Sequence, residues 1–405
     1  MKQKKLTFTI LSISLLTVMA GAAIAPALGV ISRHFADSSS ILVQLIVSMP
    51  ALTIIITNLF FAPLCRIMKT RTLALLGLVM YIVFGAGAYF VDSIWMVLLF
   101  RAMLGVSVGM IMPLSTGLLA YYFPPEEQAQ LMGLAGFMNQ MGGVVATLIS
   151  GLLSGISWNC SFLVYLLGVI ALGLVVAFLP NERLTTGEKT LETSPDFYES
   201  ETGVTKARKK PGRPFSSLMR FAPSVLGMYL QMLLFFIFPT NFAITASANE
   251  ALTGNGITLI MVGLDVVAAI IGLFFGRMMG SMSRSMKYMA PVTFLLGYLC
   301  YSLGVATPLL LAGSVLVGLA NGIGMPYLNT IASIKGGKDA ATTVMPLISA
   351  ALYLGQFTSP LIVGPLSSLI DSPTAPYMVG VVIAAIYLLQ AFISRSYHAL
   401  APVER

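Results

Sequence analysis

The sequence predicts an all-α polytopic membrane protein with twelve transmembrane helices in two pseudo-symmetric six-helix bundles. Hydrophobic residues make up 57% of the 405 residues and charged residues 9%, against about 25% charged in an ordinary soluble domain. Apolar runs of the length needed to cross a bilayer recur along the whole chain. A charged segment divides these runs into two sets of six, and one glycine pattern occurs in both sets.

The first apolar run, at about 6–31, follows Lys2, Lys4 and Lys5. It is too long for a signal peptide and has no convincing cleavage site, so we expect a retained first span. The other spans of the first half are expected at 41–64, 73–91, 94–120, 128–153 and 160–180. Those of the second half are expected at 221–247, 254–279, 288–306, 308–333, 341–365 and 375–395.

These runs predict three parts of the chain. They are an N-terminal six-helix bundle at 1–180, a charged cytoplasmic linker at 181–219, and a C-terminal six-helix bundle with a short cytoplasmic tail at 220–405.

The distribution of Lys and Arg predicts the orientation in the membrane. Basic residues fall in the loops at 66–71, 277–287 and 335–338 and in the linker, and such loops are usually cytoplasmic. We therefore expect both termini in the cytoplasm and a multi-pass protein of the cell membrane, with a bacterial cytoplasmic membrane favoured. The net charge of +8 would then face anionic lipid headgroups, so no nucleic-acid partner is expected. The basic stretch at 206–213 indicates lipid contact, with a regulatory partner as the alternative.

A repeated glycine pattern relates the two halves. Residues 105–113 read Gly-Val-Ser-Val-Gly-Met-Ile-Met-Pro, and residues 318–326 read Gly-Leu-Ala-Asn-Gly-Ile-Gly-Met-Pro. Glycines four residues apart let membrane helices approach closely, and the predicted packing glycines are Gly105, Gly109, Gly318 and Gly322. At the same offset, Gly142 matches Gly355 and Gly151 matches Gly364. Parallel repeats of this kind place a substrate cavity at the membrane midplane between the halves.

Two charged side chains lie deep in predicted spans. A charge at the bilayer centre costs about 2.5–3.5 kcal/mol on insertion scales, so such residues are usually functional. Because burial favours the neutral form of a carboxyl group, Asp265 is a candidate proton carrier or an attractor of cationic substrates; the alternative is a structural acid. Arg101 is expected to pair with an acid, a substrate carboxylate or backbone carbonyls, and the alternative is a structural tie.

Uncharged polar side chains within the spans are candidates for the cavity wall, although hydrogen bonding between helices is the commoner role of such groups. The predicted cavity residues are Asn139, Gln140, Gln231, Asn241, Asn321, Tyr327, Tyr353 and Gln356. Asn139, Gln140 and Gln231 are the first choices.

The sequence offers no pattern for enzyme chemistry. Cys65, Cys160 and Cys300 are odd in number and widely spaced, and the two histidines do not cluster, so neither a disulfide framework nor a metal site is indicated. No phosphate-binding loop or nucleophile–base set is present. We expect no cofactor, no metal and no enzymatic activity.

The sequence resembles the major facilitator superfamily over essentially its whole length. The stretch Arg101-x-x-x-Gly105-x-x-x-Gly109 is similar to the family's arginine–glycine motif. In proton-coupled members of the family, this motif is associated with proton transfer. The stretches 24–31 and 124–128 are similar to the drug:proton antiporter branch. The 2–3 loop at 62–71 lacks the acidic residue of the family signature, and the stretch at 142–147 lacks the antiporter proline.

This resemblance implies the two-bundle fold of the family and a secondary active transporter that works by alternating access. Proton-coupled efflux of amphipathic or drug-like compounds is the favoured function, with Asp265 as the proton site and Arg101 as the charge that resets it. One alternative is uptake or exchange of a small organic anion or sugar, with Arg101 as the carboxylate anchor. Another is a receptor or scaffold that does not transport. The expected partners are a small-molecule substrate, protons and membrane lipid, and the chain is expected to be a monomer.

Overall fold

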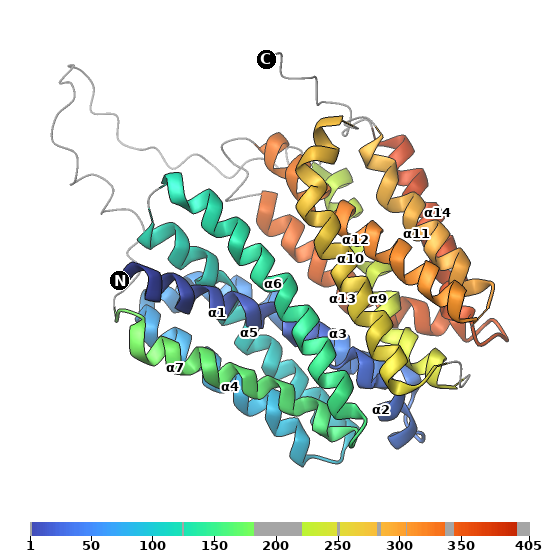
Figure 1. The fold of residues 1–405 in the computed structure, drawn as a ribbon, viewed down its shortest axis with the longest axis horizontal. Helices are drawn as coiled ribbons and strands as arrows, with labels where there is room; N and C mark the ends of the chain where they lie inside the picture. Colours follow the sequence, from blue (N-terminus) through green and yellow to red (C-terminus); the bar gives the residue numbers. More distant parts are fainter. Residues whose placement is uncertain are drawn as a thin grey trace.

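The computed structural model describes residues 2–123, 125–181, 221–248, 252–281, 285–304, 306–336 and 344–394. These residues form helices joined by short loops (Figure 1). Nearly all of the predicted linker at 181–219 and the tail after residue 394 lie outside the described residues.

The helices form two groups that follow one another in the chain. The N-group comprises α1 (Lys2–Ala22), η1 (Ala25–Ala27), α2 (Leu28–His34), α3 (Ser40–Ile67), α4 (Thr70–Ala86), η2 (Gly87–Phe90), α5 (Ile94–Tyr122), α6 (Pro125–Ser154), η3 (Asn159–Leu167) and α7 (Gly168–Phe178). The C-group comprises α9 (Ala222–Ala248), α10 (Gly254–Ser281), α11 (Met286–Ser302), α12 (Thr307–Gly336), α13 (Met345–Ser367) and α14 (Ala375–Ile393). Within the described residues, 11 helical segments are long and apolar enough to cross a membrane, and α11 is shorter at 17 residues.

Two of the expected continuous spans are interrupted. The first span contains α1, the 3₁₀ turn η1 and α2, with Pro26 inside the turn. Proline lacks the N–H that an α-helix needs at this point and favours such a break. The span expected at 160–180 begins as the 3₁₀ segment η3 and becomes α-helical only at Gly168. Hydrophobic periodicity did not reveal either interruption, because both parts of each span remain apolar.

The repeated glycines occupy equivalent helix contacts in the two groups. A Cβ added to Gly105 would overlap the backbone of Pro50 in α3, and one added to Gly318 would lie 2.8 Å from the carbonyl oxygen of Leu264 in α10. The α3–α5 and α10–α12 contacts therefore correspond to each other. Gly142 in α6 meets the backbone of α1, and Gly355 in α13 meets the backbone of α9. The repeat in the sequence is thus a repeat of helix packing.

The two groups meet near α2, at what we call the α2 end of the molecule. There, a Cβ added to Gly29 would lie 2.6 Å from the carbonyl oxygen of Ala243. Gln44 Nε2 donates a hydrogen bond of 2.8 Å to Asn241 Oδ1, and both side chains are buried. Figure 1 shows the helices of the two groups converging toward α2 and diverging toward the opposite end, where α1 begins.

Candidate functional site

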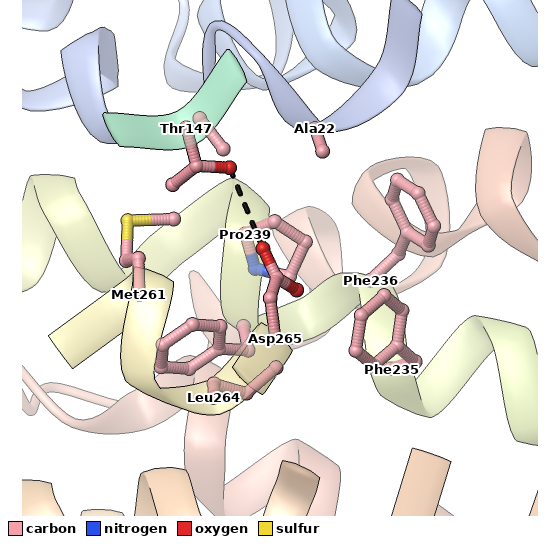
Figure 2. A pocket seen from close by; sticks show the side chains of 10 residues that line it. Ala22, Thr147, Phe235, Phe236, Pro239, Met261, Leu264 and Asp265 are labelled. Carbon is pink, nitrogen blue, oxygen red and sulfur yellow. Dashed lines mark hydrogen bonds between the residues drawn. The ribbon is translucent and has the colours of Figure 1, made fainter. Parts of the chain in front are cut away.

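A small pocket lies between the two groups and contains Asp265 (Figure 2). The N-group contributes Ala22, Ala25 and Thr147 to its wall. The C-group supplies the rest, from α9 and α10: Phe235, Phe236, Phe238, Pro239, Met261, Leu264 and Asp265. Its volume is about 40 Å³, which suffices for a few water molecules. It is well below the roughly 300–1,000 Å³ of sites that take small organic molecules.

Asp265 lies near the middle of α10 and joins the two groups. Thr147 Oγ1 of α6 donates a long hydrogen bond of 3.4 Å to Asp265 Oδ2, and Figure 2 shows this bond spanning the pocket. The remaining walls are apolar side chains and Pro239. Apart from Thr147, the surroundings therefore offer the carboxylate little stabilisation. A bundle motion that separated α6 from α10 would break this bond.

Arg101 is fully buried inside the N-group. Its Nε donates to the carbonyl oxygen of Ile46 in α3 at 2.5 Å, and its two terminal nitrogens donate to Tyr165 Oη and to the carbonyl oxygen of Ala20. A guanidinium group has five N–H donors in a rigid fork, which suits it to several acceptors at once. Arg101 therefore ties α5 to α1, α3 and η3.

Both carbonyls that Arg101 contacts lack an ordinary helical donor. The Ile46 carbonyl would accept from residue 50, which is Pro50 and has no N–H. The Ala20 carbonyl lies in the last turn of α1, which ends at Ala22, and carbonyls of a last turn have no intrahelical partner. A positive charge is also favourable at a helix C-terminus. Arg101 thus stabilises two interrupted helices of the N-group.

Arg101 and Asp265 contact different parts of the molecule. The three acceptors of Arg101 belong to the N-group, whereas Asp265 accepts from Thr147 across the group boundary. Their connection runs through the end of α1, because Ala20 accepts from Arg101 and Ala22 lines the Asp265 pocket. A direct pair between the two charges, which the sequence left open, is not the arrangement of this conformation.

The predicted amide side chains are distributed over several helix contacts. Asn139 Oδ1 accepts from Thr17 of α1 at 2.8 Å, inside the N-group. Gln231 is fully buried, donates to the Ala320 carbonyl at 3.2 Å and accepts from Tyr387 at 3.3 Å, which joins α9 to α12 and α14. Asn241 pairs with Gln44 at the α2 end. In this conformation these amides connect helices.

The other predicted cavity residues also lie in different places. Tyr327 and Gln356 are buried, and Gln140 is half-buried. The Oδ1 atom of Asn321 is buried and has no hydrogen-bond partner among the described residues. Tyr353 Oη donates to Met112 Sδ at 2.8 Å, which links α13 of the C-group to α5 of the N-group.

Tyr353 lines a second and larger pocket, which we call the α3–α5–α13 crevice. Its volume is about 450 Å³, which falls within the usual range for small-molecule sites. The lining residues are Ile55, Asn58, Leu59, Phe61, Met112, Pro113, Met345, Pro346, Ser349, Ala350 and Tyr353. No residue of this set lines the Asp265 pocket.

Three contact residues of the site were not among the sequence candidates. Thr147 and Tyr165 hold the two buried charges, and Gln44 bridges the groups. Pro50 was the one available signal, because a proline inside a long apolar run leaves a carbonyl that needs another donor. The sequence does not reveal which donor comes within reach of it.

Two groups of membrane-length helices around a buried carboxylate indicate a polytopic membrane protein. The sequence matches the Major Facilitator Superfamily over residues 10–360. The chain belongs to this superfamily, and it is a transporter.

Known proteins show how far the similarity extends. Quinolone resistance protein NorA of Staphylococcus aureus is 25% identical over 363 residues, which cover 85% of this chain and 86% of NorA. A solved bacterial homolog of the human lysosomal transporter Spinster, described as inward-facing and occupied, superimposes with a TM-score of 0.78 at 14% identity, covering 99% of both chains. The nucleoside transporter NupG superimposes with a TM-score of 0.70 at 11% identity, covering 98% of this chain and 100% of NupG. The structural likenesses concern the fold alone.

Proposed function

We propose that this transporter is a secondary active carrier that exports amphipathic, drug-like compounds in exchange for protons by alternating access. The observation that carries the proposal is the Thr147–Asp265 hydrogen bond, which joins the two groups through a carboxylate in an apolar pocket. Protonation would remove the charge on Asp265, so its protonation state would be coupled to the separation of α6 from α10. The similarity to a quinolone resistance protein supports export of drug-like compounds.

The orientation of the molecule follows from the placement of basic residues. With both termini in the cytoplasm, as the Lys and Arg distribution favours, the diverging end of the two groups faces the cytoplasm. The α2 end then closes the outer side, where Gly29, Gln44 and Asn241 bring the groups together. This conformation is the inward-open state of the proposed cycle.

The organic-anion alternative assigns a substrate carboxylate to Arg101. In this structure that side chain is fully buried and already donates to Ile46, Tyr165 and Ala20. A substrate anion would have to replace these acceptors inside the N-group. The structure therefore favours proton exchange at Asp265 over anion binding at Arg101.

The test uses the purified protein in liposomes loaded with a pH-sensitive dye. Lipophilic cations, uncharged aromatic amphiphiles, carboxylates and sugars are added in turn to the parent protein, to Asp265→Asn and to the matched control Asp371→Asn. Asp371 is an exposed carboxylate in the loop before α14. We expect one class of compound to drive proton movement, which Asp265→Asn abolishes and Asp371→Asn retains. Proton movement that persists in Asp265→Asn would refute the coupling role, and substrate flux without proton movement would indicate a uniporter or an exchanger.

A further inference from the structure

We propose that the α3–α5–α13 crevice binds an uncharged aromatic amphiphile that carries a hydrogen-bond donor. This inference rests on the proposed export function, because it names the chemical class of the compound and the place where it binds. It separates the substrate from the proton site. The crevice holds about 450 Å³ and the Asp265 pocket about 40 Å³, so of these two pockets the crevice is the one that accommodates an organic molecule in this conformation.

The lining of the crevice selects against charged ligands. None of the described residues that line it is acidic or basic, and most are apolar. A charged ligand would lose its hydration there without gaining an opposite charge. Phe61, Met112 and Tyr353 instead offer aromatic rings and a polarizable thioether, which pack favourably against an aromatic ring.

Asn58 supplies the polar contact. Its Oδ1 atom is buried and has no hydrogen-bond partner among the described residues. A buried acceptor without a partner is destabilising. Asn58 lines the crevice, and rotation of its amide about the Cβ–Cγ bond would present Oδ1 to an N–H or O–H group of a ligand, which would supply the missing bond. The amide of Asn58 therefore distinguishes a ligand that has a donor from one of the same shape that has none.

The crevice also depends on how far the two groups are separated. Tyr353 Oη of the C-group donates to Met112 Sδ of the N-group at 2.8 Å, and a thioether sulfur is a weak acceptor. This contact is easily exchanged for a bond to a ligand. Because α3 and α5 belong to one group and α13 to the other, a motion of the groups would change the shape of the crevice.

Exposed apolar side chains of α3 lie beside the crevice. Leu59 lines the crevice and is 74% exposed, and its neighbours Ile56 and Phe60 are exposed by 47% and 59%. All three lie in the candidate membrane span Ser40–Phe61. A compound dissolved in the bilayer can therefore reach the crevice along an apolar surface.

The test measures equilibrium binding of tritiated N-phenyl-1-naphthylamine, a neutral aromatic compound with one N–H donor. The purified full-length protein is used in detergent without a proton gradient, and each variant is first checked by gel filtration and thermal melting. Ser349→Trp fills the crevice, and Asn58→Leu removes the acceptor at similar size. Leu361→Trp is the control, because Leu361 is an exposed residue of the same helix outside the crevice. We expect Ser349→Trp to weaken binding at least tenfold, Asn58→Leu to weaken it about three- to tenfold, and Leu361→Trp to leave it unchanged.

A second ligand makes the result independent of any variant's folding. The N-methyl derivative of the same compound lacks the donor, so it should bind the parent protein about three- to tenfold more weakly. Its affinity should then be unaffected by Asn58→Leu. Equal binding of both ligands to the parent protein, or equal binding by the parent and Ser349→Trp, would overturn the proposal. If the parent protein shows these binding differences but transports no compound in exchange for protons, the proposed function is refuted and the binding site in the crevice is retained.

Discussion

The role of Arg101 gives the sharpest test of the packing described above. Arg101→Met keeps an unbranched apolar stem and removes the donors to Ile46, Tyr165 and Ala20. A buried carbonyl that loses its partner costs about 1–3 kcal/mol. Removing a buried charge returns part of its desolvation energy. We expect Arg101→Met to lower the free energy of unfolding by about 2–4 kcal/mol. The loss is not larger because the Ala20 carbonyl retains a 3.3 Å hydrogen bond from Tyr165 Oη.

A double-mutant cycle isolates the part of this loss that belongs to Ile46. Pro50→Ala restores a backbone N–H in α3, and the Ile46 carbonyl can accept a hydrogen bond from it. Arg101→Met should therefore lower the free energy of unfolding by about 1 kcal/mol less in the Pro50→Ala background than in the parent protein. This difference is the net contribution of one hydrogen bond. The readout is the melting temperature of the purified protein, followed by gel filtration after heating. Equal losses in the two backgrounds would show that Arg101 does not act by capping the carbonyl that Pro50 leaves free.

The other predictions concern glycine contacts. Gly142→Ala should destabilise the N-group by about 1–3 kcal/mol through overpacking, because its Cβ would overlap the Leu15 carbonyl. Gly173→Ala, whose Cβ would have nothing within 4 Å, should be neutral or stabilising; a Gly142→Ala protein that melts no lower than Gly173→Ala would contradict the packing. Gly29→Cys with Ser247→Cys, in a chain whose native cysteines are replaced by serine, should form a disulfide on oxidation. An added Cβ at Gly29 would lie 3.0 Å from that of Ser247, and a small separation of α2 from α9 would bring the pair into the roughly 3.5–4.5 Å range of disulfides. This bond should stop transport until a reductant is added, with Gly29→Ala and Ser247→Ala together as the steric control; transport that continued through the cross-linked protein would show that the α2 end need not open.

Some features of the site were predictable because they follow from chain chemistry alone. A carboxylate and an arginine inside apolar runs are conspicuous wherever the helices pack, which is why Asp265 and Arg101 could be singled out. The glycine repeat was equally visible. The partners of these residues were not predictable, because Thr147 and Tyr165 reach the charges across sequence separations of 118 and 64 residues.

The amide side chains also show what the sequence could not predict. Polar amides inside apolar spans are typical of cavity walls. In this conformation, however, each of Asn139, Gln231 and Asn241 makes a hydrogen bond to a neighbouring helix. Which face of a helix turns inward depends on its rotation, and rotation is set by packing against neighbours. The rotation of a helix about its axis therefore cannot be predicted from a single sequence.

The sequence by itself determined the membrane class, the two halves and the two buried charges, because length, hydropathy and repetition are properties of the chain. Only the tertiary structure decided where those charges act. Arg101 satisfies carbonyls in α1 and α3, and Asp265 faces the other group through Thr147. The structure also brought α3, α5 and α13 together around the larger crevice. The physical reason is that hydrogen bonds and cavities depend on side chains meeting across helices, whereas hydropathy only determines that those helices enter the membrane.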